Sequence, residues 1–546
     1  MPVKHLLIIF GWTLLIHLPF IDQPYHIDDP LFYHLGNQIA EGNNAYEYKI
    51  NWASYDKRLL DFFSNPPGIG YFIALVINFL GDSERAFHLS YMVFTVLAAV
   101  SCYFFALYFK CPPLISSLLL ISTPMYMVMA HTIMPDIALL AFYLFTVTLF
   151  LWGLKNESKR LLLLSGISAG LAIMFRYNGL SILPLLGLLL FLNPDKFNRW
   201  SFAAIVIPFG IFIFWNFYSF AIYGNSHFLH QWRFQNSFEA DETNKWIAFF
   251  ISNAGYLSSA TVFPLIFLLP IKFFKNVRLT LIGVVGMVVL IYSLFIQDRA
   301  SYTLLHAIMV ITFMSCWGFF TVVVLRDLIS QLKAYHVDRD LIFLICWIGG
   351  VMVLHTTGIH TAAKYMLPAL PPLIILLHKY GFAKIKGTHQ AMALFATLFV
   401  AFLISRADYQ LAMLNKEMVS FSKSQMDLDG ESNVYFTGHW GFQYYMEAEG
   451  FEAYEFKEDR LKHGDYMVTS SLSYPQGIKW DQKVGLEFLA EKKFKTSFGL
   501  RSMNAEKGRH ANFYSYRPKQ YGVLPFTLSE NYIDTLTVYR RKPIQP

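Results

Sequence analysis

The first apolar run of the chain, residues 5–21 (HLLIIFGWTLLIHLPFI), is followed closely by an acidic stretch at residues 25–30, YHIDDP. About 20 apolar residues cross the hydrocarbon core of a bilayer, so the run predicts a membrane span. Asp28 and Asp29 therefore lie at the mouth of that span. Ionisable groups in such a place are costly unless they are solvated or functional, although Asp-Asp-Pro is also ordinary turn chemistry. These residues alone leave both interpretations open.

The composition of the whole chain is typical of a polytopic membrane protein. Of its 546 residues, 55% are hydrophobic, 17% are aromatic and only 15% are charged, and the mean hydropathy is +0.39. The net charge of +7 does not indicate a nucleic-acid partner, because the charges sit in short loops and form no basic patch. The four cysteines show no CxxC spacing, so we predict neither a disulfide framework nor a structural zinc site.

About thirteen apolar runs are candidate spans, and the first is expected to stay uncleaved because no small-residue cleavage site follows it. They lie at residues 5–21, 86–109, 112–131, 136–154, 161–176, 178–192, 200–222, 247–271, 279–297, 302–325, 341–358, 364–378 and 389–405. The apolar part of the long first loop, residues 66–80, is short for a span and predicts a helix at the membrane interface. A cytoplasmic N-terminus places most loop Lys and Arg residues inside, so residues 22–85 form the first outer loop.

The composition changes after residue 405, where basic and acidic residues nearly balance. We therefore divide the chain into a membrane domain, residues 1–405, and a small α/β domain, residues 406–546, outside the cytoplasm. The pattern predicts strands and helices in the second domain; the strands lie at 433–437, 465–470, 513–516 and 535–540, and the helices at 441–450 and 484–493. This domain shows no acid–base constellation, so we expect it to cover the outer face and shape acceptor access.

Several charged residues are predicted to share the outer side, each at or near the end of a span. The acidic ones are Asp28, Asp29 and Asp136, and the basic ones are Arg176, Arg299 and Lys364, with Tyr365 beside the last. Each has an ordinary structural explanation, such as a helix cap, a snorkelling anchor or an aromatic belt. Together they predict a site for an anionic, lipid-borne substrate, in which Arg and Lys hold phosphate and a carboxylate acts as base.

Five segments in order resemble one family of membrane enzymes. They are HIDDPLFYHLGNQIAEG, NPPGIGYFIALVINFLGDSERAFHL, HTIMPDIALLAFYLFTVTLFLW, GISAGLAIMFRYNGLSILP and KYMLPALPPLIILL. Over roughly residues 5–405 the chain resembles the GT-C glycosyltransferases of the protein O-mannosyltransferase and lipid A aminoarabinose transferase type. It is similar to the bacterial relatives that act on lipopolysaccharide or envelope glycans. The resemblance implies a GT-C fold in a bacterial inner membrane.

The resemblance also implies a reaction, the inverting transfer of a sugar from a polyprenyl-phosphate carrier to an acceptor at the outer face. The acceptor would be lipid A or lipopolysaccharide, an envelope glycan or a protein. Asp28 matches the catalytic acid of the family, Asp29 stands where many relatives have Glu, and Asp136 matches the acid of the second outer loop. Arg176 and Tyr365 match residues near the carrier phosphate. No nucleotide cofactor is needed, because the donor is already activated; a divalent metal is compatible with the acids, but no ligand spacing requires one.

Further substrate-binding candidates are less closely matched. Tyr33 follows the acidic pair, and Arg299 and Lys364 supply cations beside Arg176. The chain departs from the family at Asn65, where relatives such as the aminoarabinose transferase have a Lys before Pro-Pro that helps to hold phosphate.

Two other classes of function compete with a transferase. A transporter or flippase of a lipid-linked substrate would also need many spans and outward charges, but it would be expected to show repeated halves and charges near the midplane. A membrane scaffold would make Asp28→Asn silent. The sequence identifies neither the sugar, nor the acceptor, nor the carrier length.

Overall fold

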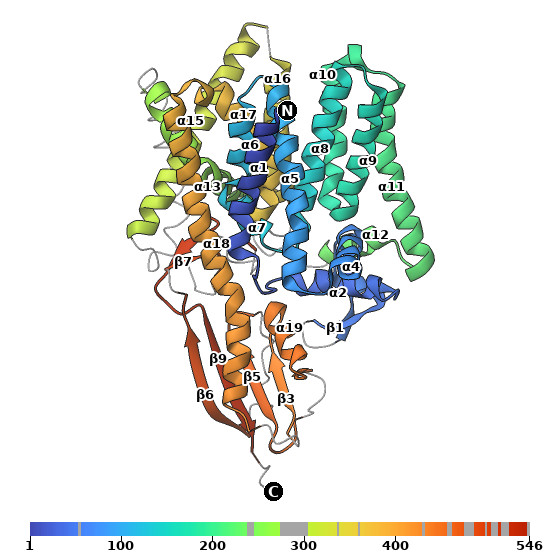
Figure 1. Cartoon of the computed structure of the whole chain (residues 1–546), viewed down its shortest axis with the longest axis vertical. Helices are drawn as coiled ribbons and strands as arrows, with labels where there is room; N and C mark the ends of the chain where they lie inside the picture. Colours follow the sequence, from blue (N-terminus) through green and yellow to red (C-terminus); the bar gives the residue numbers. More distant parts are fainter. Residues whose placement is uncertain are drawn as a thin grey trace.

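Helix α1, Val3–His17, begins a bundle of helices that carries a smaller lobe at one end, and N-terminus and lobe lie at opposite ends (Figure 1). The computed structural model describes residues 1–542 except 53–55, 237–244, 274–303, 336–337, 359–360, 428–431, 456–460, 474–484, 497–498, 504–510 and 515–522. Within these residues, eight helices are long and apolar enough to cross a membrane. They are α1, which continues into η1 (Leu18–Phe20), α5 (Glu84–Tyr108), α8 (Asp136–Lys155), α11 (Arg199–Tyr223), α13 (Lys245–Phe273), α15 (Leu304–Lys333), α16 (Arg339–Thr356) and α18 (Gly387–Ser424).

The other predicted spans form shorter or bent helices, and prolines or short loops interrupt all of them except α9 (Lys159–Phe175). Residues 112–131 form α6 (Pro113–Ile121) and α7 (Pro124–Ala130), which meet at 61°. The remaining ones are α9, η3 (Tyr177–Ser181) with α10 (Ile182–Leu192), and η6 (Ala363–Ala369) with α17 (Leu370–Lys379). The run predicted at 279–297 lies outside the described residues. Short helices η4 (Pro194–Lys196) and η7 (Phe382–Lys384) occur in loops.

The first long loop folds against the end of the bundle that faces the lobe (Figure 1). It contains α2 (Asp29–Ala40), η2 (Ala45–Glu47), the antiparallel pair β1 (Lys49–Asn51) and β2 (Asp56–Arg58), α3 (Leu59–Phe62) and α4 (Gly68–Leu80). Helix α4 is the predicted interfacial helix, and it exposes Tyr71, Leu75, Phe79 and Leu80. Helix α12, His227–Asn236, packs against α3.

The lobe is built on a five-stranded sheet in the order β4-β3-β5-β9-β6. Its elements are β3 (Val434–Thr437), α19 (Trp440–Ala448), β4 (Glu452–Ala453), β5 (Tyr466–Ser470), β6 (Leu486–Phe494) and β9 (Asp534–Arg541). Strand β3 is parallel to β4 and β5, whereas β9 is antiparallel to β5 and β6. A separate pair joins β7 (Leu500–Arg501) to β8 (Thr527–Leu528).

The structure departs from the sequence-based predictions for the lobe at three points. The helix predicted at residues 484–493 is wrong, because those described residues form β6, which pairs with β9 along its whole length. Tertiary pairing overrides the helical pattern of its side chains. Helix α18 continues to Ser424, so the expected domain boundary at residue 405 falls inside a helix that links bundle and lobe. The strand expected at 513–516 is not formed at Phe513 and Tyr514, and its remainder is outside the described residues.

Candidate active site

Asp28 and Lys364 come from opposite parts of the sequence and meet at the end of the bundle next to the lobe. Asp28 lies directly before α2, and Lys364 lies in the first turn of η6. Lys364 Nζ is 3.7 Å from Asp28 Oδ2; the Lys364 side chain is 4% exposed and the Asp28 side chain 36%. A carboxylate that is held by a cation yet open to solvent can accept a proton from a bound hydroxyl.

Arg176 and Asp136 form a second, buried ion pair close to the first. Arg176 Nη1 donates to Asp136 Oδ1, and the guanidinium lies 4.8 Å from the centre of the Tyr365 ring. Lys364 Nζ lies 5.8 Å from the same ring, so Tyr365 stands between the two cations. Burial lowers the pKa of Arg176, but Asp136, Tyr365 and Asp28 offset this, and the pKa is raised overall. Asp136 Oδ2 is buried with no hydrogen-bond partner among the described residues.

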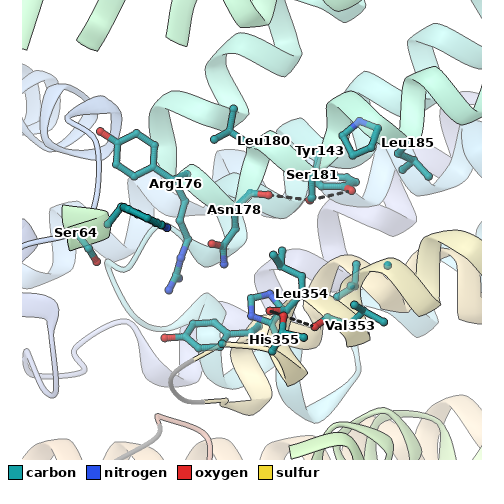
Figure 2. Close-up of a pocket in the computed structure, with 18 of the residues that line it drawn as sticks. Ser64, Tyr143, Arg176, Asn178, Leu180, Ser181, Leu185, Val353, Leu354 and His355 are labelled. Carbon is teal, nitrogen blue, oxygen red and sulfur yellow. Dashed lines mark hydrogen bonds between the residues drawn. The ribbon is translucent and has the colours of Figure 1, made fainter. Parts of the chain in front are cut away.

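A cavity of about 960 Å³ extends from Arg176 and Tyr365 between α10, α12 and α16. Figure 2 shows Arg176 and Asn178 on one side and Leu354 and His355 on the other. The His355 ring stacks on Tyr365, with 4.9 Å between ring centres. Most of the remaining wall is apolar, with Leu180, Pro184, Leu185, Leu188, Trp347 and Val351. The cavity therefore combines one permanently charged side chain, that of Arg176, with a largely apolar wall.

Two further residues of this cavity bear on the sequence predictions and on experiments. Asn65, where the family has a phosphate-binding Lys, lines the same cavity as Arg176. Cys346 also lines it and is exposed, whereas Cys102, Cys111 and Cys316 are buried. Reaction of the Cys346 thiol with a maleimide can therefore report whether the cavity is occupied.

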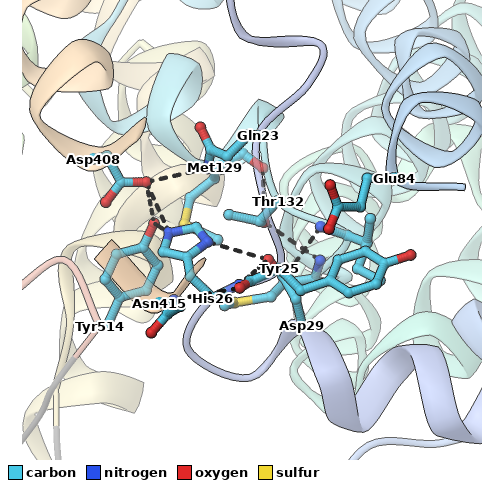
Figure 3. Close-up of polar contacts among 12 residues, drawn as sticks. Gln23, Tyr25, His26, Asp29, Glu84, Met129, Thr132, Asp408, Asn415 and Tyr514 are labelled. Carbon is cyan, nitrogen blue, oxygen red and sulfur yellow. Dashed lines mark hydrogen bonds and ion pairs between the residues drawn. The ribbon is translucent and has the colours of Figure 1, made fainter. Parts of the chain in front are cut away.

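His26 connects the acidic pair to α18 and to the lobe (Figure 3). Its ring lies between Asp29 and Asp408, with Nδ1 3.2 Å from Asp29 Oδ2 and Nε2 2.9 Å from Asp408 Oδ2. Burial lowers the pKa of His26, but Asp408 and Asp29 raise it to about 10, so the ring is protonated at neutral pH. Asp29 Oδ1 accepts the Ile133 backbone N–H at 3.0 Å, three residues before Asp136.

The backbone between His26 and Asp28 is strained. Ile27 has a φ of 52°, a conformation that β-branched residues rarely adopt. Such a residue costs on the order of 1–3 kcal/mol and persists only where its surroundings hold it. The buried contacts of His26 and Asp29 supply that support, so they also determine where Asp28 points.

The remaining predicted site residues are Asp29, Tyr33 and Arg299. Asp29 is fully buried, and its carboxylate contacts His26 and the Ile133 backbone. Tyr33 donates its hydroxyl to Asp82 Oδ2 at 2.7 Å and packs on Tyr444 of the lobe. Arg299 lies outside the described residues.

Sequence reasoning missed His26, Asp408 and Tyr514. His26 is next to the acidic pair, and Asp408 is a lone carboxylate just beyond the last predicted span, so both had a weak signal. Tyr514 had none, because nothing in the sequence places it near residue 26. Within the described ranges, no three His, Cys, Asp or Glu side chains converge as metal ligands; that no metal is required stays a prediction.

Residues 64–218 match the family model described as dolichyl-phosphate-mannose-protein mannosyltransferase. The matched part contains Asp136 and Arg176 but not Asp28 or Lys364. The match confirms, over these residues, the resemblance to the GT-C glycosyltransferases that the motifs indicated. Together with the apolar spans, it supports a multi-pass membrane glycosyltransferase of the GT-C type.

Solved structures resemble the chain over most of its length. ArnT from Cupriavidus metallidurans bound to undecaprenyl phosphate superposes with a TM-score of 0.48 at 12% identity, covering 90% of this chain and 97% of that chain. The oligosaccharyltransferase AglB from Archaeoglobus fulgidus, in complex with an inhibitory peptide and a dolichol-phosphate, gives 0.48 at 11% identity, covering 86% and 69%. None of the curated protein sequences matches the chain significantly.

Proposed function

We propose that the chain transfers a sugar from a polyprenyl-phosphate carrier to an acceptor at the outer face of a bacterial inner membrane, with inversion at the anomeric carbon. The acceptor is lipid A or lipopolysaccharide, an envelope glycan or a protein. One observation carries the proposal: Arg176 and Tyr365 line a largely apolar cavity, and behind them lie the Arg176–Asp136 and Lys364–Asp28 pairs, with Tyr365 near both cations. A polyprenyl-phosphate sugar combines a long apolar tail, which an apolar cavity can hold, with an anionic phosphate, which cations can bind.

The leaving phosphate is assigned to Arg176, with Lys364 beside it. Guanidinium N–H groups bind phosphate oxygens through charge-assisted hydrogen bonds, which strengthen as the leaving group gains charge. Asp136 fixes the guanidinium through one oxygen.

Asp28 is assigned as the general base. It takes the proton of the acceptor hydroxyl while that oxygen bonds to the anomeric carbon. The bond from the anomeric carbon to the carrier phosphate breaks, and its electron pair leaves with the phosphate. Attack opposite to the leaving group inverts the anomeric carbon, and the protonated Asp28 releases its proton to solvent, to which it is partly open.

Transfer in detergent tests this proposal against the transporter alternative. Undecaprenyl phosphate carrying radiolabelled mannose, glucose or aminoarabinose is incubated with the purified protein and an envelope extract that supplies acceptors. A transferase moves label to an acceptor without a sealed compartment. Movement of the donor across sealed vesicles without transfer would overturn the proposal in favour of a flippase. Mass spectrometry of lipid A and envelope glycans, with and without the protein, then identifies the acceptor.

If the cavity holds the carrier tail, a larger side chain in the cavity should weaken binding of the donor. Gly350, on α16, lines the cavity, and a Cβ at this position meets no atom within 4 Å. The leucine side chain of Gly350→Leu can therefore occupy cavity space without a clash. Overpacking costs about 1–3 kcal/mol, so we expect the donor KM to rise by about tenfold while kcat at saturation changes little. Kinetics of transfer at varied donor concentration measure both.

The neighbouring glycine provides a matched control. A Cβ at Gly349 also meets nothing within 4 Å, but this residue is not among those that line the cavity. Gly349→Leu should therefore leave the donor KM unchanged. Equal donor KM values for the two variants would place the carrier tail elsewhere.

A further inference from the structure

A short segment of the lobe, Ala511–Tyr514, is buried against the membrane part of the chain. The Tyr514 hydroxyl donates to Asp408 Oδ2 at 2.9 Å and lies 3.2 Å from His26 Nε2. Asn512 contributes its backbone oxygen, which accepts the Ala363 N–H at 2.9 Å. The Tyr514 ring also lies 5.7 Å from Lys364 Nζ.

The segment thus touches both chain segments that carry the Asp28–Lys364 pair. His26 is two residues before Asp28, and Ala363 directly precedes Lys364. Contacts from one segment to both partners fix their relative position, because each partner lies within two residues of a point of contact. Two neighbouring residues of the bundle also contact both sides, since Asp29 Oδ1 accepts the Ile133 N–H and Lys364 Nζ lies 3.5 Å from Met134 Sδ.

The contact on the Asp28 side runs through a buried polar cluster. Asp408 accepts from Ser502 Oγ at 2.7 Å as well as from Tyr514, and it faces the His26 ring (Figure 3). His26 in turn bonds to Asp29, the first residue of α2. The lobe therefore supplies two hydroxyls, those of Ser502 and Tyr514, to the carboxylate that orients His26.

We propose that Ala511–Tyr514 is a positioning segment that sets Asp28 against Lys364, so that the lobe completes the active site. This inference rests on the proposed function of Asp28. It differs from the expectation that the lobe only covers the outer face and shapes acceptor access. Tyr514 acts through His26 and Asp408, and it is a positioning residue, not a catalytic one.

Tyr514→Phe tests the inference because it removes only the hydroxyl and keeps the ring. Misplacement of a reacting group by about 1 Å can lower a rate by about 100-fold, so we expect kcat to fall between tenfold and that value. Binding of undecaprenyl phosphate, measured as protection of Cys346 from a maleimide, should not change. The matched control is Tyr466→Phe, which removes another buried hydroxyl of the lobe, one that contacts the Asp427 backbone. Its kcat should be that of the native chain.

A second background separates positioning from general destabilisation. In Asp28→Glu the carboxylate is already displaced by one methylene group. Adding Tyr514→Phe to this variant should therefore lower kcat by less than twofold. A loss of equal size in both backgrounds would overturn the inference, and so would native kcat in Tyr514→Phe alone. A native chain that uses none of the labelled donors would overturn the proposed function, and this inference with it. An active native chain with an unaffected Tyr514→Phe overturns the inference only.

Discussion

Asp28→Asn is expected to lower transfer by about 10²- to 10⁴-fold, the usual contribution of a general base. The change is nearly isosteric, and the amide oxygen can still accept from Lys364, whose ammonium lies 3.7 Å from the carboxylate. Folding should therefore be retained while the proton acceptor is lost. The measurements are kcat for transfer of labelled sugar and thermal unfolding in detergent.

A carboxylate in the same long loop between α1 and α5 supplies the control. Asp61 pairs with Arg58 at 3.0 Å and its side chain is 35% exposed, close to the 36% of Asp28. Asp61→Asn should keep the native rate, because an exposed ion pair of this kind contributes little. Near-native turnover of Asp28→Asn would remove Asp28 as the base. It would instead favour an acceptor that is itself a phosphate and needs no base, with a positional role for the carboxylate.

The sequence predicted those parts of the fold whose pattern is local. The apolar runs form helices, and the short apolar stretch after Pro66-Pro67 forms α4, because hydrophobic length and helix chemistry are readable along the chain. Strands β3 and β5 and helix α19 also lie close to their predicted positions. Strand β6 was missed because its identity depends on pairing with β9, more than 40 residues later in the chain.

The sequence indicated which residues to consider for the candidate site, but not which of them contact each other. Their placement on one side of the membrane was predicted from the count of spans and loop charges and stays a prediction. That Lys364 faces Asp28, and that Arg176 faces Asp136, depends on helix packing across long sequence separations. The link from Tyr514 to His26 is longer still, at 488 residues. Such contacts leave no periodic signal, so they required the structure.

Arg176→Ala is expected to have two separable effects, one on the donor and one on stability. Loss of charge-assisted hydrogen bonds to phosphate costs about 1.5–3 kcal/mol, so the Kd for undecaprenyl phosphate should rise by about tenfold or more. The substitution also leaves the buried Asp136 carboxylate without its cation. Breaking a buried ion pair on one side costs about 3–5 kcal/mol, so the unfolding temperature should fall as well.

A double variant distinguishes these effects. Arg176→Ala with Asp136→Asn removes the uncompensated charge, so it should recover much of the stability while donor binding stays weak. Arg85→Ala is the control: Arg85 forms an exposed ion pair with Asp22, so the substitution should change neither donor binding nor stability. Protection of Cys346 by undecaprenyl phosphate reports the Kd in each variant. If donor binding recovers together with stability, Arg176 only neutralises Asp136, and the phosphate is held elsewhere, with Arg299 the next residue to substitute.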